Sequence, residues 1–419
     1  MSGFGFTPNE GVFGGPINEG SPMLATSALR EGARKFLATH NDLPVGTLDL
    51  AKISEACTIA NTWIEDKTQF PMSTFNSDLA WTRREWMESS IPGWQKLVEP
   101  LAQGMAEALV KVMGQISPDI PEEMRASFNI ESFLPVMRGF MGSLIAGQLG
   151  QSIGALSINI TSANDVALPL FAKNGTHLIP QNIATWSEGL DLPEQEVLIY
   201  LALREVAANR LFAHTPWLSD YLRDLITAYG KGITVDIAAI QNQAEDALST
   251  GELDINNPDS ITLAINNGMF QPEQSPAQAA ALSKLEMALA LIEGWIDHVT
   301  ELSATDRLPS LSALQETHRR ARITSSPTQQ LFASLLGLEV SPRKMRECAN
   351  FWREIYILSA NNDAESAVSI RDHRWEDPTL LPTADDLADP VGFLASTTVP
   401  DDLSGLLQSP LVLDKGGSS

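Results

Sequence analysis

The stretch from residue 191 to residue 218 constrains the fold of this chain more than any other part of the sequence. Apolar side chains such as Val197 and Leu201 recur there near the spacing of an α-helix. Asp191 can cap the start of this helix, and Glu194, three residues later, completes the pattern of a capping box. A helix this apolar is buried, so the rest of the chain must cover it on all sides.

A charged pair, Arg204 and Glu205, lies in the middle of this apolar helix and needs buried partners. In zinc hydrolases, two His residues four positions apart on one helix bind the metal, and the Glu that follows the first His activates water. Arg204 and Ala208 stand where those two His residues would be, and Glu205 stands where the catalytic Glu would be. The spacing of the motif is therefore present without either imidazole.

Flanking stretches extend this pattern over most of residues 50–395. They are AWTRREWMESSIPGWQKLVEP (80–100), GFMGSLIAGQLGQSIG (139–154), NIATWSEGLDLP (182–193), LREVAANRLFAHTPWL (203–218), LALIEGWIDHV (289–299) and LLPTADDLADPVGF (380–393). With these stretches the chain resembles the zincin-like family of actinobacterial proteins, which are described as zinc-dependent metalloproteases or hydrolases. The resemblance implies a mainly α-helical, zincin-like metalloprotease fold with a small β-sheet.

The sheet is expected just before the central helix, because such sheets flank the active-site helix in zincins. Residues 156–171 and 175–180 carry alternating or β-branched runs, and the turn dipeptide Asn174-Gly175 lies between them. The sequence therefore predicts strands in these two runs.

The resemblance also sets the expected domain boundaries. A zincin-like domain is expected at residues 23–395, with a helical part at 23–155 and a motif-bearing part at 156–395. Residues 1–22 and 396–419 are interpreted as flexible tails.

Glu293 and Asp297 share one face of a second long helix, because they are four residues apart. In zincins whose third ligand is Glu, a Glu-Gly pair with an Asp four residues after the Glu supplies that ligand and its support. The resemblance thus implies that Glu293 is the ligand position and Asp297 the supporting residue. If the geometry follows the family, Arg204 points at Glu293 and fills the metal site with an ion pair. The residues alone favour an ordinary buried carboxylate that pairs with a basic neighbour.

Ligand chemistry predicts that this chain binds no metal and no other cofactor. A catalytic zinc site needs about three protein ligands and an open position. Ala208 supplies no ligand, and Arg204 adds a permanent positive charge. His214 and His298 are the alternative ligands, but His214 lies nearly three helical turns past Arg204 and His298 is turned about 100° away from Asp297.

Composition bears on the partners of the chain. The 52 acidic and 28 basic residues give a net charge of -24, which disfavours nucleic acid and anionic membranes and favours a basic protein or peptide. The basic runs at 318–322 and 343–346 are interpreted as solvated helix faces or internal ion pairs. Cys57 and Cys348 are the two cysteines, so no disulfide framework or thiolate metal site is expected.

Residues 133–160 form the most apolar long segment of the chain. Arg138 and Gln148 interrupt it, and its regularly spaced small residues also suit close packing of soluble helices, so no membrane span is expected. Residues 1–22 lack the basic start and apolar core of a secretory signal. A cytoplasmic location is therefore expected.

Three functional hypotheses follow. The leading one is a pseudoenzyme, a binding or scaffold protein that has lost zinc and catalysis and binds an unidentified protein or peptide. The competing one is an active zinc-dependent metallohydrolase, a peptidase, that uses a noncanonical set drawn from Glu205, Glu293, His214 and His298. The third is a protein associated with membranes through residues 133–160.

Overall fold

The protein is built almost entirely of α-helices. The computed structural model describes residues 22–72, 78–116, 130–233, 275–325, 342–360 and 363–397. Within these ranges there are twelve α-helices and three short 3-10 helices, which confirms the predicted mainly helical fold. The tails predicted at residues 1–22 and 396–419 lie almost entirely outside the described residues.

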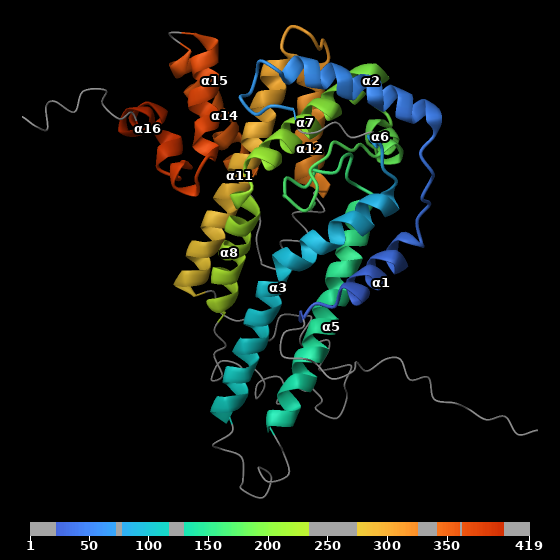
Figure 1. Ribbon diagram of the computed structural model, residues 1–419, viewed down its shortest axis with the longest axis vertical. Helices are drawn as coiled ribbons and strands as arrows, with labels where there is room; N and C mark the ends of the chain where they lie inside the picture. The colour runs from blue at the N-terminus through green and yellow to red at the C-terminus, as the bar shows by residue number, and fades with distance from the viewer. Residues whose placement is uncertain are drawn as a thin grey trace, which may run out of the picture.

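The α-helices follow one another along the chain with the following bounds (Figure 1). They are α1 (Thr26–Leu37), α2 (Thr47–Ile64), α3 (Arg83–Ile116), α5 (Ile130–Ser157), α6 (Pro180–Ser187), α7 (Glu194–His214), α8 (Trp217–Lys231), α11 (Pro276–Ala304), α12 (Leu311–Ser325), α14 (Pro342–Ser359), α15 (Ala364–Asp372) and α16 (Pro390–Thr397). The 3-10 helices are η2 (His373–Trp375), η3 (Pro378–Leu380) and η4 (Asp386–Ala388).

Helix α7 is the predicted central helix, and every residue from Val197 to Phe212 is buried. Helices α2, α6, α11 and α12 pack around it (Figure 1). The predicted capping box at its start is wrong, because the helix begins at Glu194 with Pro193 at the N-cap and no side-chain cap. The fixed φ of proline sets the start of the helix without the Asp191 carboxylate.

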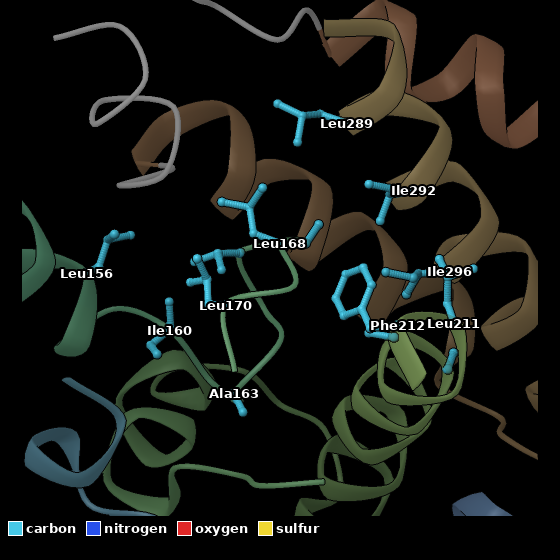
Figure 2. Close-up of a cluster of buried hydrophobic side chains, with 14 of the residues drawn as sticks. Leu156, Ile160, Ala163, Leu168, Leu170, Leu211, Phe212, Leu289, Ile292 and Ile296 are labelled. Atoms are coloured by element: carbon cyan, nitrogen blue, oxygen red, sulfur yellow. The ribbon is translucent and has the colours of Figure 1, made fainter. Parts of the chain in front are cut away.

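A hydrophobic cluster joins α7 to α11 and to the irregular segment that precedes α6 (Figure 2). Leu211 and Phe212 come from α7, Ile292 and Ile296 from α11, and Leu168 from the segment. This apolar layer holds the three elements in fixed positions beside the polar residues described below.

The predicted small sheet is not found among the described residues. Instead, Leu178 forms two isolated bridges, a parallel one with Ala80 and an antiparallel one with Ser162. Beyond these bridges the Ala163 amide still donates to the His177 carbonyl oxygen at 2.8 Å, but the His177 amide, which would return this hydrogen bond in an antiparallel sheet, donates to the Glu205 carboxylate. The β-branched runs at residues 156–180 therefore line a loop that is held by a side chain.

The Gly-rich segment that made a membrane span conceivable is helix α5, which packs on α1. A Cβ on Gly150 would lie 2.5 Å from the Leu29 carbonyl oxygen, so this glycine permits close contact between two helices. Among the described residues, no helix is long and apolar enough to cross a bilayer.

Helix α11 has the predicted capping box, in which the Ser275 hydroxyl accepts from the Gln278 amide and the Gln278 side chain accepts from the Ser275 amide. Helix α14 packs closely on α11 at Gly294. A Cβ on Gly294 would lie 2.7 Å from the Ala349 nitrogen and 2.8 Å from the Cys348 carbonyl carbon. The glycine that follows Glu293 thus serves helix packing.

We expect Gly294→Ala to destabilise the protein by about 1–3 kcal/mol, because the new methyl group meets backbone atoms that cannot move aside. Gly147→Ala is the matched control, since a Cβ there meets nothing within 4 Å. The control variant should gain up to about 1 kcal/mol from helix propensity. Urea unfolding of both variants checks the difference, and equal stabilities would contradict the packing argument.

Candidate functional site

Four parts of the chain meet at one small polar pocket: α7, α11, α12 and residues 161–165. The pocket has a free volume of about 10 Å³, which is room for about one water molecule. It is lined by Thr161, Ser162, Asn164, Asp165, Leu201, Arg204, Glu205, Ala208, Glu293, Ile296 and Arg322. The two ligand positions on α7, Arg204 and Ala208, therefore face the same space as Glu293.

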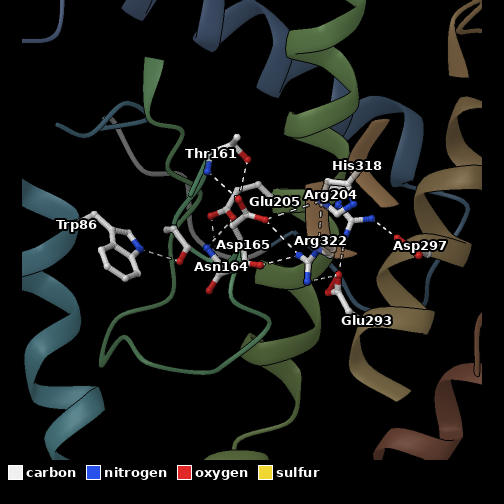
Figure 3. A network of polar contacts seen from close by, with 11 residues as sticks. Trp86, Thr161, Asn164, Asp165, Arg204, Glu205, Glu293, Asp297, His318 and Arg322 are labelled. Carbon is white, nitrogen blue, oxygen red and sulfur yellow. Dashed lines mark hydrogen bonds and ion pairs between the residues drawn. The ribbon is translucent and has the colours of Figure 1, made fainter. Parts of the chain in front are cut away.

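The Arg204 guanidinium lies between two carboxylates of α11 (Figure 3). Its Nη2 donates to Glu293 Oε1 at 2.8 Å, and its Nη1 donates to Asp297 Oδ1. This is the ion pair that the sequence predicts between Arg204 and Glu293. Burial alone would lower the pKa of Arg204, but Asp297 and Glu293 reverse the effect and raise it, so the group stays charged.

A second arginine, Arg322 of α12, contacts the same carboxylate (Figure 3). Its Nη1 lies 2.8 Å from Glu293 Oε1. Its Nη2 donates to the Asp165 carbonyl oxygen at 2.7 Å and to Asp165 Oδ1 at 3.2 Å. We refer to Arg204, Arg322, Glu293, Asp297 and Asp165 as the arginine cluster.

The carboxylates of the arginine cluster differ in their surroundings. Burial raises the pKa of Glu293, although Arg322 and Arg204 oppose the effect. Burial also acts to raise the pKa of Asp297, but the contact with Arg204 outweighs it and leaves the pKa lowered. Glu293 Oε1 receives both guanidinium groups, whereas Glu293 Oε2 is buried without a hydrogen-bond partner among the described residues.

Glu205 forms no ion pair with any residue in the described part of the chain. It accepts instead from the Asn164 backbone amide at 2.9 Å, from Asn164 Nδ2 at 2.9 Å and from the His177 amide at 3.2 Å. Burial raises the pKa of Glu205 to about 7, and these hydrogen bonds limit the rise. The side chain fastens the preceding loop to α7.

His318, one helical turn before Arg322, completes the polar layer. Burial lowers the pKa of His318 to about 4, so the imidazole is neutral at pH 7. Its Nε2 accepts from Arg322 Nε at 3.4 Å. His318 Nε2 also lies 3.9 Å from Asp165 Oδ1. Because the ring is neutral and Nε2 is already an acceptor, this contact is not an ion pair.

Sequence reasoning missed the contributions of Asn164, Asp165, His318 and Arg322 to this site. The run that contains Asn164 and Asp165 indicated a strand, and nothing in it marked these two residues as part of a site. The basic run at 318–322 is interpreted from the sequence as a solvated helix face or internal ion pairs, and Arg322 forms internal ion pairs. Nothing in this run identifies the carboxylates that Arg322 meets.

The two histidines weighed as alternative zinc ligands do not line the pocket. His214 is at the end of α7, where Nδ1 lies 2.8 Å from the Arg210 carbonyl oxygen and the ring stacks on Phe70. His298 is buried beside Tyr356, and burial together with nearby Arg371 keeps its pKa well below the usual value.

The residues at the pocket do not fit a zinc ion. Ala208 offers no donor atom, the Arg204 guanidinium has no lone pair, and Glu293 Oε1 is already shared by two arginines. Within the described ranges, no three or more His, Cys, Asp or Glu side chains are grouped so that they could hold a metal ion. The donor set contrasts with the three ligands of a catalytic zinc site.

Comparison with known proteins yields one family and one solved structure. The family described as zincin-like metallopeptidase matches residues 26–394. The chain is also similar to the crystal structure of a putative hydrolase with a novel fold from Chloroflexus aurantiacus, with a TM-score of 0.57 and 17% identity over 89% of this chain and 98% of that chain. At this identity the likeness shows a shared fold. No curated protein matches the chain.

We expect Glu205 to make stability depend on pH. Because its pKa is raised in the folded state, the folded protein binds more protons than the unfolded chain between about pH 4.5 and 7, and this contribution to stability is lost as pH rises through that window. Between pH 5 and 8, wild type should lose about 1–3 kcal/mol of unfolding free energy relative to Glu205→Gln.

Urea unfolding of both proteins at the two pH values measures this difference. Glu194→Gln, which removes an exposed carboxylate from the same helix, controls for the loss of one charge. A stability difference between wild type and Glu205→Gln that is the same at pH 5 and pH 8 would contradict the prediction.

Proposed function

The chain belongs to the zincin-like metallopeptidase family, and we propose that it is a noncatalytic member that keeps the fold and acts by binding a protein or peptide partner. The observation that carries the proposal is the position of Arg204. Its guanidinium stands at the first ligand position of the family and binds Glu293 and Asp297, the residues that the family resemblance implies as third ligand and support.

The charge of the pocket supports this proposal. A metal site that loses its cation leaves buried carboxylates without compensation, which is strongly unfavourable. Arg204 and Arg322 supply positive charge to Glu293 and to the neighbouring Asp297 and Asp165. Each of the three carboxylates therefore has a guanidinium partner without zinc, and a divalent cation would add repulsion from two guanidinium groups.

The position of Glu205 supports the proposal independently. A general base must present a free lone pair to the water that it activates. Three of the roughly four lone-pair positions of this carboxylate accept N–H groups from Asn164 and His177. The residue at the family's catalytic position thus has a structural role that uses most of its accepting capacity.

We further propose that the protein uses no cofactor and that its partner has a basic surface. The net charge of -24 favours a partner with a basic surface and disfavours nucleic acid. A basic partner would be attracted over a range limited by the Debye length, so its binding should weaken as salt is added.

We expect wild-type protein, purified without a histidine tag and exchanged against excess zinc, to retain less than about 0.1 zinc per chain, because Arg204 and Ala208 supply no ligand. The double variant Arg204→His/Ala208→His should retain about one zinc per chain, since both positions line the pocket with Glu293. Mass spectrometry of the metal content measures both values.

The single variants Arg204→His and Ala208→His are the matched controls, because each restores only one imidazole. Circular dichroism establishes that all variants remain folded. Stoichiometric zinc in the wild type would contradict the proposal and would favour the alternative, an active metallohydrolase.

A further inference from the structure

Arg322 is held by acceptors that match the shape of a guanidinium group. Glu293 Oε1 receives Nη1, the Asp165 carbonyl oxygen and Oδ1 receive Nη2, and His318 Nε2 receives Nε. These acceptors come from α11, from the loop before α6 and from α12 itself. Every nitrogen of the guanidinium therefore has an acceptor on a different side of the group.

We propose that Glu293 and Asp165 form a guanidinium-binding site, and that the arginine side chain of a partner peptide can occupy it in place of Arg322. The proposal rests on the proposed function, because a metal ion on Glu293 would remove the main acceptor. It names the chemistry of the partner: an exposed arginine on a basic protein or peptide.

The geometry selects arginine over lysine. The two terminal nitrogens of Arg322 point at separate acceptors, Glu293 Oε1 at 2.8 Å and the Asp165 carbonyl oxygen at 2.7 Å. A planar guanidinium offers five N–H donors in a fixed fork, whereas an ammonium group is a point charge. Glu293 Oε2, buried and without a partner among the described residues, leaves an additional acceptor for an incoming donor.

Arg322 is the arginine of the cluster that can be exchanged. Its side chain is 18% exposed, compared with 7% for Arg204, and it lies three residues before α12 ends at Ser325. Arg204 is fixed in the middle of α7, where all neighbouring positions are buried. Arg322 is therefore the arginine of the cluster that an external guanidinium would displace.

Removal of the internal arginine should expose the site to a probe. The test uses the full-length chain carrying Arg322→Ala and the peptide acetyl-Gly-Arg-Gly-amide, with matched peptides that carry lysine or citrulline instead of arginine. Citrulline keeps the shape of arginine without its charge. Isothermal titration calorimetry and the melting temperature, Tm, report binding.

We expect the Arg322→Ala variant to bind the arginine peptide at least about tenfold more tightly than it binds the lysine or citrulline peptide. The variant should also bind the arginine peptide at least about tenfold more tightly than the wild type does, because Arg322 competes in the wild type as an intramolecular ligand. At ten times its Kd, it should raise the Tm of the variant by about 2 °C. The further change Glu293→Gln should abolish the binding. Equal binding of the three peptides, or binding unaffected by Glu293→Gln, would overturn the proposal.

Displacement of Arg322 by the arginine peptide in the wild-type protein is tested by amide hydrogen exchange at saturating peptide. The backbone amides of residues 318–325 in α12 should exchange their hydrogens faster when the peptide takes the place of Arg322. Unchanged hydrogen-exchange rates there would refute the displacement of Arg322 in the wild type. If Arg322→Ala does not fold, Arg322→Met keeps the aliphatic part of the side chain and replaces it in the titrations. Zinc retained by the wild type would contradict the proposed function. A zinc-free protein whose Arg322→Ala variant does not bind the arginine peptide would contradict this inference alone.

Discussion

The burial of the Arg204 charge inside α7 is the constraint on which the rest of this structure depends. Every residue from Val197 to Phe212 is buried, so the guanidinium cannot reach water along its own helix. An unpaired buried charge is strongly unfavourable, and α11 must therefore place Glu293 and Asp297 opposite it. The register between the two central helices follows from this requirement as much as from their apolar contacts.

Several features could be predicted from the sequence because local rules decide them. Apolar periodicity identified the helix that contains Arg204, and the Ser275-Gln278 pattern identified the start of α11. The stretches that flank the motif, such as LREVAANRLFAHTPWL (203–218) and LALIEGWIDHV (289–299), carried the resemblance to a family that the match over residues 26–394 confirms. The Arg204-Glu293 ion pair followed from that alignment, because a motif position fixes which helix faces meet.

Other features depend on contacts between segments that are distant in the sequence. The strands expected around residues 156–180 are reduced to isolated bridges in the described structure. Glu205, which lies outside that run, accepts from the His177 amide that would otherwise continue the pairing. Strand propensity does not account for such competition. The ion pair between Arg322 and Asp165 could not be predicted from the sequence either, because it depends on where α12 packs relative to a loop that is distant in the chain.

The attachment of the loop before α6 through Glu205 also determines how that loop can move. In a sheet, the hydrogen bonds of a strand can open one after another from its end. Here the amides of Asn164 and His177 both depend on one carboxylate in the middle of a buried helix. Their opening is therefore coupled to the core, and this loop belongs to the same cooperative unfolding unit as α7.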